Sequence, residues 1–357
     1  MNILDLARPH LRTLAPYKSA RSLASGGEVL LDANESPRVL SNDTELENLN
    51  RYPAPQPPEL LRQAAGYYGV PAERIVITRG ADEGIDLLVR AFTEPGRESI
   101  IITPPTYGVY AIAARLHGAG VLEVPLDPAK GFALDAPGIF ATARIAPVKL
   151  VFVCRPNNPT GTDADLTDVA ALAAELAGRA LVVVDEAYLE FSGRPSAAQL
   201  IGHMPNVVVL KTLSKAWGLA GARVGFLLAD AAIANLLHTV RAPYPISALS
   251  ARAAETVFNA PGASAMKRSV AQILSERARV AGRLKTLPCV EKVLPSEANF
   301  LVAIFKEKDA ALTALRSRGI IVRDRSAEPG LAGGIRITIG LPEENDRLLD
   351  VLEKLDG

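Results

Sequence analysis

Short apolar runs rich in β-branched residues recur along the first part of the chain. Most of them are continuously hydrophobic rather than alternating, a pattern typical of strands buried on both faces of a sheet. The runs lie at residues 74–78, 99–103, 120–124, 149–153, 180–184, 206–210 and 223–228. Segments with the 3.6-residue period of an amphipathic helix lie between several of them, as at residues 81–92 and 165–178. Strands and helices in alternation predict an α/β domain with a mostly parallel sheet.

The last of these runs breaks the alternation. Only about a dozen residues separate residues 206–210 from residues 223–228, and a right-handed crossover through a full helix would be cramped in that length. We therefore predict that the last strand runs antiparallel to its neighbour.

The C-terminal part follows a different pattern. A long charged amphipathic segment at residues 266–287 precedes apolar runs at residues 299–305 and 334–340. Helical segments lie at residues 309–319 and near the C-terminus. The smaller number of strands and helices predicts a smaller α+β domain.

The first 40 or so residues contain several prolines and glycines and little periodicity. They are typical of an arm that packs against another part of the protein. The predicted organisation is an N-terminal arm at residues 1–45, a large domain at residues 46–260 and a small domain at residues 261–357.

Composition and charge narrow the classes of ligand. Hydrophobic residues make up 48% of the chain and charged residues 22%, as in ordinary globular proteins. The 39 basic and 39 acidic residues balance, which argues against nucleic acid as the main ligand, because binding to a phosphate backbone needs an excess of lysine and arginine. A small anionic ligand needs only a local cluster of cations.

Metal binding and membrane attachment find no support in the sequence. Cys154 and Cys289 lie far apart and the four histidines are scattered, so the spacing of a zinc site is absent and we expect no metal. The first residues lack the pattern of a signal peptide, and every apolar run is too short for a membrane span. We expect a cytoplasmic protein without membrane contact.

Side chains that could bind a ligand or act in catalysis lie just after five of the predicted strands, at the edge where ligands bind in open α/β sheets. One strand end leads into the start of a helix, whose N–H groups favour anions. Another carries a carboxylate that needs a partner to remain charged in apolar surroundings. The candidate residues at these strand ends are Ala81, Asp82, Tyr107, Asn157, Asp185, Tyr188, Ser214, Lys215 and Arg223.

One ligand would use all of these groups: pyridoxal phosphate. Lys215 would bind its aldehyde covalently, and Asp185 would pair with the pyridine nitrogen and keep it protonated. These two residues follow consecutive buried strands, which places them at the same edge of the sheet. Each residue taken singly is more often structural, but the set together favours a cofactor site.

Four segments resemble the fold-type-I aminotransferases of class II, namely "VCRPNNPTG", "VVVDEAY", "TLSKAWGLAGARVGF" and "GIRITIG". The segments "LDANESP", "NRYPAPQP", "RGADEGIDLLVRAF" and "APYPIS" are similar, more narrowly, to the histidinol-phosphate aminotransferase family. This resemblance covers essentially the whole chain. It implies the fold of a fold-type-I pyridoxal-phosphate transferase, with a mostly parallel seven-stranded sheet in the large domain and a smaller α+β domain at the C-terminus.

The resemblance also implies a role for each cofactor residue. Lys215 would hold the cofactor and transfer the proton, and Asp185 would pair with the ring nitrogen. Asn157 and Tyr188 would donate to the ring hydroxyl, and Tyr107 would stack on the ring. The phosphate would be bound by Ala81, Asp82, Thr212, Ser214 and Arg223, together with Tyr52 of the partner subunit. A shared site of this kind implies a homodimer.

For the substrate, the resemblance implies that Arg336 and its companion Arg323 bind an anionic group. A guanidinium fork suits both a carboxylate and a phosphate. Tyr17 and Asn34 match further substrate contacts, so the N-terminal arm would close over the site.

The function implied is ping-pong transamination between L-histidinol phosphate and 2-oxoglutarate, giving imidazole-acetol phosphate and L-glutamate in histidine biosynthesis. Burial and nearby positive charge must then lower the pKa of Lys215. Three alternatives stay open at this point: an aromatic amino-acid aminotransferase, a threonine-phosphate decarboxylase and a non-catalytic cofactor-binding module of a regulator. The last is disfavoured because the sequence has neither a DNA-binding domain nor a basic excess.

Overall fold

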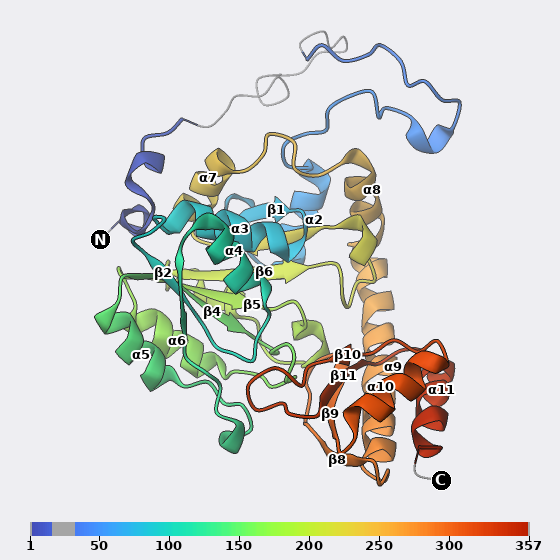
Figure 1. Cartoon of the computed structure of the whole chain (residues 1–357). Helices are drawn as coiled ribbons and strands as arrows, with labels where there is room; N and C mark the ends of the chain where they lie inside the picture. Colours follow the sequence, from blue (N-terminus) through green and yellow to red (C-terminus); the bar gives the residue numbers. More distant parts are fainter. Residues whose placement is uncertain (1, 16–32, 356–357) are drawn as a thin grey trace.

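Two β-sheets form the framework of the chain, whose computed structural model describes residues 2–15 and 33–355 (Figure 1). The larger sheet has seven strands in the order β1-β7-β6-β5-β4-β2-β3. They are β1 (Ile75–Thr78), β2 (Ser99–Ile102), β3 (Gly120–Glu123), β4 (Val148–Cys154), β5 (Leu181–Asp185), β6 (Val207–Thr212) and β7 (Gly225–Leu228). Only β7 runs antiparallel to its neighbours. The mostly parallel seven-stranded sheet and its antiparallel last strand are therefore confirmed.

Helices cover both faces of this sheet. Three pack on one face: α3 (Gly80–Phe92), α4 (Val109–His117) and α7 (Ala231–Val240). Five contribute to the apolar layer on the other: α2 (Pro58–Tyr68), α5 (Ala136–Ile145), α6 (Leu166–Glu175), α8 (Ala248–Val257) and the first part of α9 (Ala260–Leu284). Because each face has its own apolar layer, a central strand needs hydrophobic residues on both sides.

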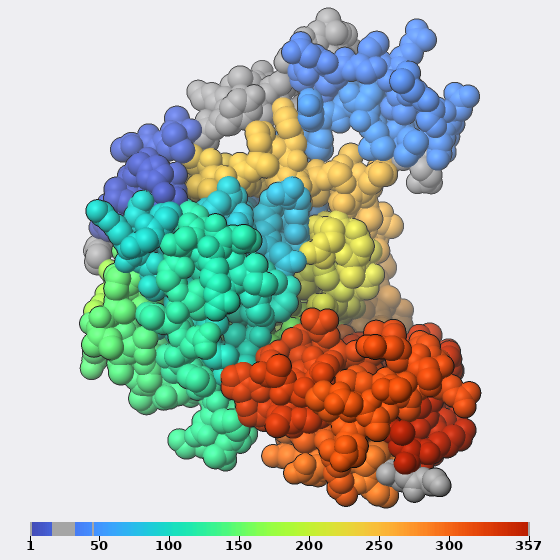
Figure 2. All heavy atoms as spheres, in the orientation of Figure 1, coloured from blue at the N-terminus to red at the C-terminus, as the bar shows by residue number. Residues whose placement is uncertain are grey.

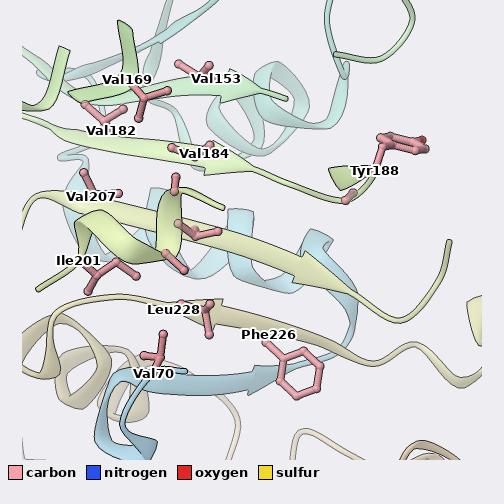
Figure 3. Packing of buried hydrophobic residues seen from close by; sticks show 14 of the residues in the cluster. Val70, Val153, Val169, Val182, Val184, Tyr188, Ile201, Val207, Phe226 and Leu228 are labelled. Atoms are coloured by element: carbon pink, nitrogen blue, oxygen red, sulfur yellow. The ribbon is translucent and has the colours of Figure 1, made fainter. Parts of the chain in front are cut away.

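Strand β5 shows how the two layers are built. Val182 and Val184 belong to the apolar cluster on one face, whereas Leu181 and Val183 belong to the cluster on the other. Figure 3 shows the first of these clusters, in which valines of neighbouring strands pack against one another. Each such side chain contributes about 1.5–3 kcal/mol through burial. The continuous apolar runs of the sequence thus have a direct structural cause.

The smaller sheet lies in the C-terminal part and is entirely antiparallel, in the order β10-β11-β9-β8. Its strands are β8 (Val290–Val293), β9 (Phe300–Phe305), β10 (Arg323–Asp324) and β11 (Gly334–Thr338). The helices of this part are α9 (Ala260–Leu284), α10 (Lys308–Ser317) and α11 (Pro342–Glu353). In Figure 2 most of this part, coloured orange to red, forms a distinct mass at the lower right of the view. α9 begins where the small domain was predicted to begin, and the three-part division of the chain stays a prediction.

The first described residues pack on the helices of the larger sheet. Leu6 and Leu11 are buried in the apolar cluster that contains α3, and Arg8 forms an ion pair with Glu94 at 3.1 Å.

The short 3-10 helices are η1 (Ile3–Leu6), η2 (Pro9–Leu11), η3 (Thr44–Leu46), η4 (Ala72–Arg74), η5 (Pro128–Lys130), η6 (Leu189–Phe191), η7 (Ala197–Leu200) and η8 (Ala220–Ala222). Among the helices of residues 2–15 and 33–355, none combines the length and the apolar character needed to cross a membrane.

Candidate active site

A pocket of about 550 Å³, counting its open mouth, lies at the carboxyl ends of the parallel strands. It brings together side chains from the segments that follow β1, β2, β4, β5 and β6. The predicted residues in its lining are Ala81, Asp82, Tyr107, Asp185, Tyr188, Thr212, Ser214, Lys215 and Arg223. Cys154, Asn158 and Ala187 complete the lining. In Figure 3, Tyr188 lies beyond the end of β5, apart from the packed valines.

Two glycines let the start of α3 approach the first residue of β7. Gly80 has a φ of 74°, and a Cβ at this position would lie 2.7 Å from Nη2 of Arg223. A Cβ on Gly225 would lie 2.6 Å from the carbonyl carbon of Gly80. Only glycine fits such an approach. The first turn of α3, with Ala81 and Asp82, is thereby held at the pocket, where helix N–H groups have no partner within the helix.

Arg223 adds a positive charge beside this helix start. Its guanidinium donates to Oγ of Ser214 at 3.3 Å and forms an ion pair with Asp82 at 3.1 Å. Thr212 donates in turn from Oγ1 to Ser214 Oγ at 2.9 Å. Arg223 has a φ of 54°, a conformation that costs a non-glycine residue about 1–3 kcal/mol and is often found at functional sites. Helix N–H groups, two hydroxyls and a guanidinium therefore converge as an anion-binding cradle.

Asp185 is the buried carboxylate of the pocket, with 3% of its surface exposed. Oδ2 accepts a hydrogen bond from Tyr110 Oη at 2.6 Å, and Oδ1 accepts one from the Ala187 N–H at 3.1 Å. Burial raises the pKa of Asp185, and these two hydrogen bonds oppose the rise. No cationic side chain of residues 2–15 and 33–355 forms an ion pair with it. A cationic ligand atom is what this carboxylate would pair with.

Tyr110 is a residue of the site that the sequence analysis missed. It is fully buried, stacks on Phe152 with ring centroids 4.7 Å apart, and meets the edge of Tyr107 at 5.6 Å. Tyr107 itself donates to Oδ1 of Asp82 at 3.0 Å. A signal was present in the sequence, because Tyr110 follows Tyr107 by three residues, a spacing that places both on one face of a helical segment.

Lys215 lines the pocket with its ammonium group 5.5 Å from the centre of the Tyr188 ring. Partial burial lowers the pKa of Lys215, and the positive charges of Arg336 and Arg223 lower it further. The carboxylates of Asp82 and Asp185 oppose this decrease. A lowered pKa increases the fraction of neutral amine, which is the form that can attack a carbonyl or accept a proton.

The structure corrects one predicted position. Asn157 is buried outside the pocket lining, and its amide donates to Pro105 O at 2.9 Å and to Thr160 Oγ1 at 2.8 Å. Asn158 lines the pocket instead and accepts a hydrogen bond from Nη1 of Arg336. The two asparagines are adjacent and identical in type, so the backbone conformation alone decides which one faces the pocket. We propose that Asn158 takes the role predicted for Asn157.

Alanine at each of these two positions separates their roles. Asn158→Ala should weaken the binding of pyridoxal phosphate to the cofactor-free protein by about tenfold, through one lost hydrogen bond to a polar ligand. Asn157→Ala should instead lower the free energy of unfolding by about 1–3 kcal/mol, because buried partners lose their hydrogen bonds. Titration with the cofactor and urea denaturation measure the two effects. If Asn157→Ala weakened cofactor binding and Asn158→Ala only lowered the free energy of unfolding, Asn157 would be the residue that binds the cofactor.

The residues predicted to bind the substrate do not all lie at the pocket. Arg336 lies on β11, directly opposite Arg323 on β10, and its guanidinium is 5.3 Å from the centre of the Phe300 ring. Through Asn158 it borders the pocket, whereas Arg323 is exposed and does not line it. Tyr17 lies outside the described residues.

Asn34 and Tyr52 share a second groove, which also contains Leu249. Tyr52 is 50% exposed and stacks on Tyr244 with ring centroids 4.4 Å apart. Asn34 is exposed and has a φ of 54°. Neither residue lines the pocket of its own chain.

The residues present fit pyridoxal phosphate. The cradle at the start of α3 offers donors and positive charge to a phosphate. The buried Asp185 carboxylate has no cationic side chain paired with it in the described part of the chain and suits a protonated ring nitrogen. Tyr107 supplies an aromatic face, and Lys215 supplies an amine of lowered pKa for the aldehyde.

Comparison with known proteins identifies the family of the chain. Residues 25–352 match the family model for aminotransferase class I and II. Histidinol-phosphate aminotransferases from Xylella fastidiosa and Escherichia coli are 45% and 44% identical to the chain, each over 99% of it and over 97% and 98% of their own lengths. The structure of histidinol-phosphate aminotransferase from Sinorhizobium meliloti in complex with pyridoxal-5'-phosphate superposes with a TM-score of 0.77 at 26% identity, covering 85% of this chain and 82% of that one.

Proposed function

Because the chain belongs to the class I and II aminotransferases and, within them, to the histidinol-phosphate aminotransferase family, we propose that it transfers an amino group between L-histidinol phosphate and 2-oxoglutarate. The products are imidazole-acetol phosphate and L-glutamate, and the reaction is the transamination step of histidine biosynthesis. The observation that carries the proposal is that one pocket contains both the buried Asp185 carboxylate and Lys215, beside an anion-binding cradle. The cofactor of this family is pyridoxal phosphate, and the predictions of family and cofactor are confirmed.

Each residue of the pocket has its own role in this reaction. Bound pyridoxal phosphate supplies a conjugated ring that takes up electrons from the substrate carbon. Asp185 would hold a proton on the ring nitrogen, and the hydrogen bonds from Tyr110 and the Ala187 N–H orient its carboxylate and favour the ionised form. Lys215 Nζ accepts the proton from the substrate carbon that bears the amine and later returns a proton, as general base and general acid in turn. Tyr107, Tyr188 and Asn158 orient the ring.

Arg336 explains how one site can serve two substrates. A guanidinium fork binds a phosphate and a carboxylate with similar geometry. Histidinol phosphate has no carboxylate, so its phosphate is the anionic group that Arg336 would bind. In the other half of the cycle the same group would bind a carboxylate of glutamate.

Product analysis tests this function. With histidinol phosphate and 2-oxoglutarate, we expect mass spectrometry to detect glutamate and imidazole-acetol phosphate in equal amounts. Phenylalanine in place of histidinol phosphate tests the aromatic alternative, and threonine phosphate tests the decarboxylase, whose mark is the release of carbon dioxide. Absence of glutamate in the first reaction, or release of carbon dioxide in the last, would contradict the proposed function.

The proposal includes a homodimer in the cytoplasm, where the amino donor and acceptor are ordinary metabolites. Tyr52 supports the dimer, because it is half exposed in a groove apart from the pocket of its own chain, beside the exposed Leu249. A residue in that position can act in the pocket of a partner subunit, which makes the two active sites depend on the contact between two copies of the chain.

Mixed dimers test this arrangement. Tyr52→Ala and Lys215→Ala proteins, each of low activity alone, should regain activity when they are unfolded together and refolded. We expect about a quarter of wild-type activity, because half of the randomly paired dimers are hybrids and each hybrid has one intact site. Absence of any gain over the separately refolded proteins would place Tyr52 outside the partner's site.

A further inference from the structure

A third arginine lies beside Arg323 and Arg336 in the smaller sheet. Strand β10 pairs Arg323 with Arg336 on β11, and the next backbone hydrogen bond runs from the Arg325 N–H to Gly334 O at 2.8 Å. Arg325 thus follows directly on β10, two residues from Arg323. Residues two apart in an extended chain point to the same side.

The Arg325 side chain is only partly satisfied by protein groups. One end of its guanidinium forms an ion pair with Glu328, Nη1 to Oε1, at 2.7 Å. Its Nε, by contrast, is buried and lacks a hydrogen-bond partner among the described residues. The side chain is 21% exposed. A buried guanidinium N–H without an acceptor is unfavourable until an acceptor reaches it.

Its positive charge acts on the active-site pocket. Burial raises the pKa of Tyr188, which lines the pocket, and the charges of Arg336 and Arg325 both oppose this rise. Phe300 links Tyr188 and Arg336 in space, because its ring meets the edge of Tyr188 at 5.2 Å and lies 5.3 Å from the Arg336 guanidinium. Arg325 and Arg323 also add to the effect of burial in lowering the pKa of Arg336. Like charges held this close together favour an anion between them.

We infer that Arg325 is a further substrate-binding residue, which contacts the substrate's phosphate group and favours a phosphorylated substrate over a dicarboxylate. The inference rests on the proposed function and extends it to specificity. A phosphate monoester carries between one and two negative charges and three acceptor oxygens, whereas a carboxylate carries one charge and two oxygens. A third guanidinium therefore adds more to the binding of the phosphate. Glu328 balances the charge of Arg325 when a carboxylate is bound.

The two half-reactions measured separately test this role in the holoenzyme. Single-turnover conversion of the bound cofactor is followed by its visible absorbance, once with histidinol phosphate and once with glutamate. Arg325→Gln should raise the half-saturating concentration of histidinol phosphate about tenfold, through one lost hydrogen bond to a charged group. The limiting rate and the half-saturating concentration of glutamate should change by less than about twofold. Arg316→Gln, an equal change of charge at an exposed position of α10, is the matched control.

Glu328→Gln gives a reciprocal test that does not depend on the folding of the first variant. It frees the Arg325 guanidinium, so the half-saturating concentration of histidinol phosphate should fall. Equal shifts for both substrates in Arg325→Gln, or a rise in Glu328→Gln, would overturn the inference.

Inorganic phosphate separates this inference from the proposed function. If the wild-type protein failed to react with histidinol phosphate, the proposed function would fail, but phosphate inhibition of the glutamate half-reaction would still test Arg325. Weaker inhibition in Arg325→Gln than in wild type and Arg316→Gln would support phosphate binding by Arg325. Equal inhibition in all three proteins would contradict it.

Discussion

Lys215→Ala is expected to abolish turnover while the protein still binds pyridoxal phosphate, now without a covalent bond. The phosphate cradle, Asp185 and Tyr107 remain in place, so affinity for the cofactor persists. The loss of the group that attacks the aldehyde and transfers the proton should lower the rate by about 10⁴-fold, the upper end of what one positioned acid–base group contributes. Steady-state rates measure the loss of turnover. Protein mass after reduction of the bound cofactor shows whether the covalent bond to the cofactor is lost.

Lys211 provides the matched control, because it lies four residues away and is also near the sheet edge. Its ammonium is buried and forms an ion pair with Glu186 at 2.6 Å, outside the pocket lining. Lys211→Arg keeps this charge, so the covalent cofactor should be retained in that variant. Multiple turnovers by Lys215→Ala, or loss of the covalent cofactor in Lys211→Arg alone, would count against the assignment of Lys215.

Asp185→Asn is expected to slow the first half-reaction by about 10²- to 10³-fold, the usual effect of removing one preorganised electrostatic group. The amide cannot balance a positive charge on the ring nitrogen, so the ring loses its proton and takes up electrons less readily. Stopped-flow absorbance with histidinol phosphate measures the single-turnover rate. A rate near that of wild type would remove Asp185 from the mechanism.

Tyr110→Phe serves as the graded comparison for this prediction. It removes one hydrogen bond to Asp185 but leaves the carboxylate in place, so the rate should fall by about tenfold at most. The hydrogen bond from Tyr110 lowers the pKa of Asp185, so its loss raises that pKa. Since the ionised carboxylate is the active form, activity in the variant should be lost at a higher pH than in wild type as the pH falls.

The sequence predicted most of the sheet that carries the site. Strands buried on both faces must be apolar throughout, so their positions and their ends are visible in the residue pattern. Because parallel strands end at one edge, residues following separate runs, such as Asp82, Asp185 and Lys215, could be placed together before their contacts were known. The antiparallel β7 was predictable from the length of one connection.

What the sequence could not predict depends on local backbone conformation and on weak patterns. Asn157 and Asn158 differ only in the direction that the backbone gives their side chains. β10 contains only Arg323 and Asp324, both exposed, and therefore has no apolar pattern. Tyr110 contacts Asp185, a residue far away in the sequence, and the role inferred for Arg325 depends on its place beside Arg336 in the smaller sheet.

The half-reaction with histidinol phosphate shows whether the protein acts on this substrate. Purified protein with its cofactor is mixed with histidinol phosphate or, at the same concentration, with phenylalanine, in the absence of any keto acid. The visible absorbance of the cofactor expected on Lys215 should disappear much faster with histidinol phosphate, because Arg336 and its neighbouring arginines would bind the phosphate. A faster loss with phenylalanine would leave the fold, Lys215 and Asp185 in their roles but would contradict the proposed substrate.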